Sequence, residues 1–98
     1  MNTEQSRYEI YLGEELGGYA EYRRGTDHIE LTHTEVNERF RGQGVAGELV
    51  RRALERAREE RMAVLPSCPY VQRWLGENPE YLDLVPGDRR EEFGLPGG

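Results

Sequence analysis

The feature that most constrains the fold is a glycine-containing stretch between a β-like run and the longest helical run of the chain. It reads Arg41-Gly42-Gln43-Gly44-Val45-Ala46. Glycines let the backbone turn tightly and bring several N–H groups close to a ligand, and a helix that begins directly behind them adds the positive end of its dipole. The stretch is therefore predicted to bind an anion at a strand-to-helix junction.

Two interpretations of this loop compete, because Gly42, Gly44 and Gly47 also spell G-x-G-x-x-G. A dinucleotide site would need a parallel βαβ unit with a carboxylate about 20 residues further on. Ser67 occupies that region with no carboxylate near it, and the upstream chain has the pattern of antiparallel hairpins. The context therefore argues against a dinucleotide site.

Three segments with alternating side chains precede the loop and predict an antiparallel meander. The strands are expected over residues 7–12, 16–23 and 28–36. The Gly17-Gly18 pair predicts a bulge or a close neighbour in the second strand. In the third strand, strict alternation places four side chains on one face: Ile29, Leu31, His33 and Glu35.

An amphipathic helix is predicted behind the loop, with a core-facing stripe that contains Val45, Ala46, Leu49, Val50, Ala53, Leu54 and Ala57. Residues 62–65 predict a buried strand parallel to the third strand. Pro69 suits the first position of a second helix that stops at Asn78, which places Cys68 at or beside its N-cap. A short segment over 81–85 is expected to pack last, with flexible ends over 1–6 and from Pro86 onward.

These residues resemble the GCN5-related N-acetyltransferases. The pattern R-x-x-G-x-A over 41–46 is similar to the family's pyrophosphate loop, and the runs LTHTEV at 31–36 and PSCPYV at 66–71 resemble its small single-domain branch. The resemblance covers about residues 8 to 85. It implies one compact α/β (α+β) domain over 1–98 with its core over about 7–85: a three-strand antiparallel meander, a crossover helix, a fourth strand parallel to the third and a short C-terminal helix.

For function, the resemblance implies an enzyme that transfers an acetyl group from acetyl-coenzyme A to an amine. Backbone amides of residues 42–46 are expected to bind the pyrophosphate, and Arg39 and Arg41 can add charge-assisted hydrogen bonds. The resemblance assigns the pantetheine arm to the point where the third and fourth strands separate. The expected coenzyme residues are Thr34, Glu35, Val36, Arg39, Arg41, Gly42, Gln43, Gly44, Val45 and Ala46.

Four side chains are candidates for the chemical steps. Cys68 could take the acyl group as a nucleophile or protonate the departing thiolate, although a lone cysteine is also a small buried hydrophobe. Tyr70, one turn into the second helix, could donate the same proton or fill the core. His33 and Glu35 could deprotonate the incoming ammonium, directly or through water.

Composition narrows the function further. The net charge of −6 argues against a nucleic-acid partner, and the absence of lysine excludes Schiff-base chemistry. One cysteine and two histidines predict no disulfide and no metal site, in agreement with a reducing compartment. No apolar run approaches the length of a membrane span and the first residues lack a signal-peptide segment, so a cytoplasmic location is expected without membrane contact.

The sequence leaves the acceptor open between a small-molecule and a peptide amine, and a monomer or weak homodimer is expected. Two alternatives remain beside the enzyme. One is a non-catalytic coenzyme A-binding or sensor module that acts with a partner, and the other is a structural domain whose loop only caps a helix. Turnover of the coenzyme would favour the enzyme, whereas tight binding without turnover would favour the sensor.

Overall fold

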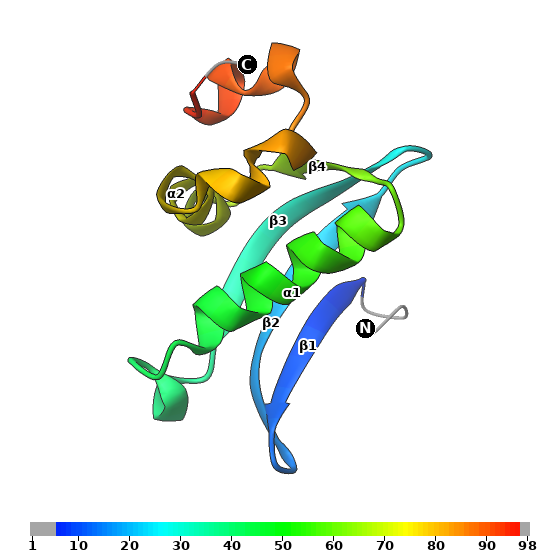
Figure 1. Cartoon of the computed structure of the whole chain (residues 1–98). Helices are drawn as coiled ribbons and strands as arrows, with labels where there is room; N and C mark the ends of the chain where they lie inside the picture. The colour runs from blue at the N-terminus through cyan, green and yellow to red at the C-terminus, as the bar shows by residue number, and fades with distance from the viewer. Residues whose placement is uncertain (1–5, 97–98) are drawn as a thin grey trace.

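The computed structural model describes residues 6–96. A four-stranded sheet in the order β1-β2-β3-β4 is crossed by one helix and flanked by a second (Figure 1). The elements are β1 (Arg7–Leu12), β2 (Glu15–Arg24), β3 (His28–Val36), η1 (Glu38–Phe40), α1 (Val45–Glu59), β4 (Ala63–Pro66), α2 (Pro69–Glu77), η2 (Pro79–Leu84), η3 (Gly87–Arg89) and η4 (Glu91–Phe93), where η marks a 3-10 helix. The predicted mixed α/β architecture is confirmed.

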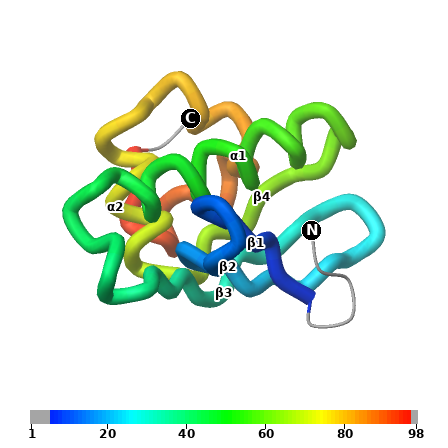
Figure 2. The backbone as a smooth tube through the Cα atoms, turned by 90° about the horizontal axis from the view of Figure 1, so that it is seen from below, coloured from blue at the N-terminus to red at the C-terminus, as the bar shows by residue number. Residues whose placement is uncertain are grey.

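The sheet has the predicted connectivity. β1 pairs antiparallel with β2, β2 pairs antiparallel with β3, and β4 runs parallel to β3. The parallel pair is possible because α1 carries the chain back across the sheet. Figure 2 shows α1 as a layer on one side of β1, β2 and β3.

The glycine pair of β2 has both predicted consequences. Ile10 pairs with Gly18 while the next pair resumes at Leu16, so Gly17 is an extra residue in β2. A Cβ atom on Gly18 would lie 2.7 Å from the carbonyl oxygen of Glu35, closer than a real side chain tolerates. The bulge shifts the register, and the second glycine lets β2 and β3 approach each other.

A second bulge, in β3, makes the side chains of this strand face differently from the prediction. Leu31 and His33 pair with consecutive residues of β2, so Thr32 is an extra residue in β3. Strict alternation was therefore wrong for this strand, because a bulge turns the following side chains over. His33 and Glu35 are exposed rather than on the buried face of Leu31, and Thr34 takes that face instead.

The core lies between α1 and the sheet and continues under α2. The helical stripe is buried as predicted except for Ala46, which is half-buried. In α2, Val71 and Leu75 are fully buried, and Tyr70 and Trp74 pack against the core.

The segment after Pro86 is not the flexible tail that its composition predicted. It forms η3 and η4, and Leu95 is buried with 7% of its surface exposed. Arg90 Nε donates to the Val85 carbonyl oxygen at 3.1 Å, and the Leu95 amide donates to the Arg90 carbonyl at 2.9 Å. Its glycines and prolines make tight turns that bring apolar side chains back to the core. Of the expected flexible lead-in, residues 1–5 lie outside the described residues, and the Ser6 carbonyl accepts a hydrogen bond from the Tyr22 amide at 2.9 Å.

Candidate functional site

The glycine loop joins η1 to α1 in a conformation that requires its glycines. Gly42 and Gly44 have φ angles of 81° and 75°, in the left-handed region that residues with a Cβ atom disfavour. A Cβ atom at either position would meet no heavy atom within 4 Å. Gly44 is the N-cap of α1 and brings no side chain to cap it. The first amides of α1 therefore lie behind open space and lack helical partners.

A hollow of about 220 Å³ lies at this junction, and most of the predicted coenzyme loop lines it. Phe40 and Gly47 were not in the predicted set, and Tyr70 comes from α2. Four members of the set do not line it: Thr34, Glu35, Arg39 and Gln43. The lining residues are Val36, Phe40, Arg41, Gly42, Gly44, Val45, Ala46, Gly47 and Tyr70.

Arg39 points elsewhere than predicted. Its guanidinium forms an ion pair with Glu15 at 2.7 Å, and the two side chains are 71% and 41% exposed. Asn37 fixes the backbone of η1 from both ends of its amide: Nδ2 donates to the Leu16 carbonyl at 3.2 Å, and Oδ1 accepts from the Arg39 amide at 3.1 Å. This arrangement ties η1 to the start of β2.

The third and fourth strands separate where the resemblance implied. Their pairing ends at Leu31 with Pro66, and one further hydrogen bond joins the Cys68 amide to the Leu31 carbonyl at 2.9 Å. Beyond that point β3 continues to Val36, whereas the chain after β4 turns into α2. Within the described chain, residues 32–36 therefore have a strand partner on the β2 side alone.

Cys68 occupies the predicted place. It is the N-cap of α2, Pro69 follows at the first helical position, and only 4% of the cysteine surface is exposed. The thiol does not cap the helix through its side chain but donates to Thr34 Oγ1 at 3.6 Å. Cys68 thus lies at the end of the strand separation, and its chemical role stays a prediction.

Tyr70 reaches the hollow from the first turn of α2. A Cβ atom on Gly47 would lie 3.9 Å from the Tyr70 hydroxyl and 3.4 Å from Trp74 Nε1, both ordinary contact distances, so Gly47 of α1 lies directly beside these two side chains of α2. Burial is the main cause that raises the pKa of Tyr70 above 10.0, and the nearby Glu77 raises it further. An ordinary tyrosine is already protonated at neutral pH, so the Tyr70 hydroxyl has a proton to donate there.

His33 and Glu35 are brought together, on the opposite face from Thr34. His33 Nε2 lies 3.0 Å from Glu35 Oε1, and the side chains are 50% and 54% exposed. The Tyr19 ring lies beside them, with its centroid 6.4 Å from that of His33. The structure thus separates the predicted groups into a pair on the exposed face and Cys68 with Tyr70 around the start of α2.

A second hollow, of about 420 Å³, lies between the start of β2 and the end of β3. Sequence reasoning missed it, because no linear pattern joins residues 15–19 to residues 35–37; only the antiparallel register does. Val36 lines both this hollow and the one at the glycine loop. Its lining residues are Glu15, Leu16, Gly18, Tyr19, Glu35, Val36 and Asn37.

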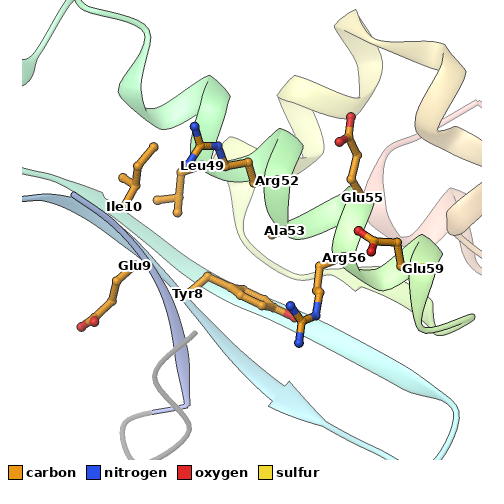
Figure 3. Close-up of a pocket in the computed structure, with 9 residues that line it drawn as sticks. All are labelled: Tyr8, Glu9, Ile10, Leu49, Arg52, Ala53, Glu55, Arg56 and Glu59. Carbon is orange, nitrogen blue, oxygen red and sulfur yellow. The ribbon is translucent and has the colours of Figure 1, made fainter. Parts of the chain in front are cut away.

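A third hollow, between β1 and α1, has about 290 Å³ and contains none of the predicted site residues (Figure 3). It opens beside the edge strand, with β2 between it and β3. Arg52 and Arg56 at its rim already bind Glu48 and Glu60, each at 2.7 Å. Because the hollow lies away from β3 and its two arginines already form ion pairs, it is a poor candidate for coenzyme binding or acyl transfer.

Among residues 6–96, no group of three or more histidine, cysteine, aspartate or glutamate side chains is placed to hold a metal ion. No helix in that range has both the length and the apolar character needed to cross a membrane.

Comparison with known proteins decides the family. Residues 7–84 match the model of the GCN5-related N-acetyl-transferases. The chain belongs to this family. The NMR solution structure of a GCN5-like protein from Staphylococcus aureus has the same fold as this family member, with a TM-score of 0.67 and 27% sequence identity over 84% of this chain and 82% of that chain.

Sequence relatives of this GCN5-related N-acetyltransferase include Protein NATD1 from several vertebrates. The protein from Xenopus tropicalis is 38% identical over 63 residues, which are 62% of this chain and 58% of the frog protein. The protein from Mus musculus is 39% identical over 59 residues, 58% of this chain and 54% of the mouse protein. The matched region is thus little more than half the length of these relatives.

Proposed function

We propose that the protein is an acetyl-coenzyme A-dependent N-acetyltransferase that acts on an amine. The observation that carries the proposal is the free edge of β3 over residues 32–36, which leads from Cys68 to the hollow at the glycine loop. Peptide-like amides of a pantetheine arm can pair with such an edge as an added strand would. The pyrophosphate would then meet the first amides of α1 and the Arg41 side chain.

The residues present fit this ligand. Gly42 and Gly44 leave the loop backbone open on the side where phosphate oxygens would approach. Arg41 lines the hollow directly. Arg39 can join it by leaving Glu15, because an exposed ion pair of this kind contributes less than about 1 kcal/mol.

The chemistry supplied by bound acetyl-coenzyme A is an activated thioester. Around it, the chain offers two kinds of proton group. Tyr70, which lines the hollow at the glycine loop, would protonate the departing thiolate, with Cys68 as the neighbouring alternative. The exposed His33–Glu35 pair is placed to accept the proton that the ammonium must lose, directly or through water.

The test has two stages. Protein freed of ligand is titrated with acetyl-coenzyme A while thermal unfolding is followed, and a ligand that binds only the native state should stabilise it by about 2.7 kcal/mol at 100 times the dissociation constant. Thiol release is then measured with a mixture of amines. Binding and amine-dependent thiol release support the proposal. Binding without thiol release supports a coenzyme A-binding sensor module instead, and absence of binding rejects both.

A further inference from the structure

We propose that the hollow between the start of β2 and the end of β3 is the acceptor site, and that it takes a protonated primary amine on an apolar or aromatic body without a carboxylate. The inference rests on the proposed function for its chemistry, but the binding site itself can be tested without the coenzyme. The hollow has about 420 Å³ and lies on the face of β3 that carries His33 and Glu35.

The lining chemistry selects the charge of the ligand. Two carboxylates, Glu15 and Glu35, line the hollow, and none of its lining side chains is cationic. Glu15 pairs with Arg39 at 2.7 Å in the structure and regains a free negative charge if Arg39 turns to the coenzyme, so Glu35 is a partner for a ligand cation in both states. An ammonium is attracted to this carboxylate, whereas a ligand carboxylate would meet like charge.

The remaining lining selects the body of the ligand. Leu16, Val36 and the ring of Tyr19 give apolar surface around the carboxylates. The Arg7 guanidinium lies 4.3 Å from the Tyr19 centroid and occupies one face of that ring, which leaves the rest of the ring for the apolar body of a ligand. Aromatic faces attract ammonium groups as well as apolar bodies. The hollow thus matches an amine whose nitrogen lies at Glu35 and whose apolar part lies against Tyr19.

The position of the hollow connects it to acyl transfer. Val36 lines both this hollow and the one at the glycine loop, and Glu35 belongs to the free edge of β3. Gly18 packs directly on the Glu35 carbonyl, and the Asn37 amide group makes two hydrogen bonds that join the end of β3 to the start of β2 and to η1. An amine at Glu35 therefore lies beside the strand segment along which we place the thioester.

The reaction balances with the groups present. The amine nitrogen forms a bond to the acetyl carbon, and the bond from that carbon to sulfur breaks. The ammonium gives up one proton to the His33–Glu35 pair before attack, and this proton passes to solvent. After attack, the departing sulfur takes a proton from Tyr70, and the second proton on the nitrogen passes through water to Tyr70, which restores its hydroxyl. The net products are an amide, a thiol and one free proton.

The first experiment locates the site without the coenzyme. 2-Phenylethylamine is titrated into the uniformly ¹⁵N-labelled protein, and we expect amide shifts to concentrate at residues 15–19 and 35–37. The shifts should weaken in Glu35→Gln, an exposed position where the change leaves the fold intact. Shifts that are absent, or that concentrate at β1 and α1 around the hollow of Figure 3, overturn the proposal.

The second experiment uses turnover, with thiol release as the readout. Tyr19→Leu should raise the KM for 2-phenylethylamine about tenfold, the loss of about 1.4 kcal/mol of binding, with kcat little changed. Glu35→Gln should raise KM and also lower kcat. Acetyl-coenzyme A should stabilise both variants against unfolding as much as it stabilises the parent. This result would show that the coenzyme site is intact, so that the change in KM reports on the acceptor site alone.

Two controls complete the design. Glu59→Gln removes the same charge on α1, at the rim of the other hollow, and should leave KM unchanged. Phenylalanine, which adds a carboxylate to the same aromatic body, should be acetylated about tenfold less efficiently than 2-phenylethylamine. The proposal is overturned if the two amines are acetylated with equal efficiency. It is also overturned if KM rises in Glu59→Gln but stays unchanged in Tyr19→Leu.

Discussion

The Cys68 thiol donates to Thr34 Oγ1 at 3.6 Å, and this contact ties the N-cap of α2 to the strand segment that separates from β4. The cysteine is buried and does not line the hollow at the glycine loop, whereas Tyr70, two residues later, does. The geometry therefore favours Tyr70 as the proton donor, and Cys68 as a buried residue that holds the start of α2 against β3.

Tyr70→Phe should lower kcat about 10²-fold while acetyl-coenzyme A still stabilises the protein, because only the donated proton is lost. Cys68→Ala should have a smaller effect on kcat, and intact-mass measurement after incubation with acetyl-coenzyme A should show no acetyl group on the thiol. Tyr81→Phe is the matched control, since that hydroxyl binds Glu55 at 2.8 Å outside the site. An acetyl mass on Cys68, lost with activity in Cys68→Ser, would instead establish a covalent intermediate.

Gly44→Glu should abolish stabilisation by acetyl-coenzyme A. The change places a side chain and a negative charge in the pyrophosphate hollow and puts a Cβ atom on a residue with φ of 75°, which costs about 1 to 2 kcal/mol of fold stability. Gly76→Glu is the control, because that helical glycine has open space and the same charge change. Thermal unfolding with and without ligand measures both effects, and equal stabilisation of the two variants would exclude the loop as the binding site.

Arg41→Ala should weaken binding of coenzyme A by about 1.5 to 3 kcal/mol but leave binding of pantetheine, which has no pyrophosphate, almost unchanged. The comparison isolates phosphate contacts from contacts with the arm. Arg23→Ala removes an equal charge at the end of β2, where the strand is exposed, and should not alter either affinity. Calorimetric titration provides the measurement, and an equal loss for both ligands in Arg41→Ala would contradict the assignment.

Tyr8→Phe should leave the protein at least as stable as the parent. The Tyr8 hydroxyl is buried under α1 and has no hydrogen-bond partner among the described residues (Figure 3). Removing such a group relieves a desolvation penalty of about 1 to 3 kcal/mol. Tyr8→Ala should instead destabilise the fold by about 3 kcal/mol, because it removes a buried ring whose centroid lies 4.8 Å from that of the Tyr22 ring. Urea unfolding of the three proteins tests this, and a clear loss of stability in Tyr8→Phe would reveal a hidden partner.

Stability should fall in acid partly through Glu48. Hydrogen bonds from Arg51 and then Arg52 lower the pKa of Glu48 from 4.5 to about 2. Because the pKa is lower in the folded state, the contribution is fully present above about pH 4.5 and is lost as the pH falls toward 2. Glu48→Gln should be less stable than the parent at neutral pH and approach it in acid. Unfolding curves across this range measure the difference, with Glu59→Gln as the control on the same helix; a constant difference would refute the linkage.

The local elements follow from the sequence because their causes are local. The period of the side chains distinguishes the strands from α1, and Pro69 with Cys68 marks the start of α2. Gly42 and Gly44 likewise predict the loop, since glycine lacks a Cβ atom and adopts left-handed backbone without the steric cost that other residues meet. These features predict the glycine loop at the start of α1, where the structure has a hollow, before any tertiary contact is considered.

The hollow between the start of β2 and the end of β3, and the faces of β3, were decided only by tertiary structure. The bulge at Thr32 depends on how β3 registers against β2, and it alone turns His33 and Glu35 outward. The same register brings Tyr19 beside Glu35, residues that are remote in sequence. The ion pair of Arg39 with Glu15 and the burial of Leu95 also join segments far apart in the chain. Such contacts depend on strand pairing and packing across the whole chain, which side-chain periodicity does not encode.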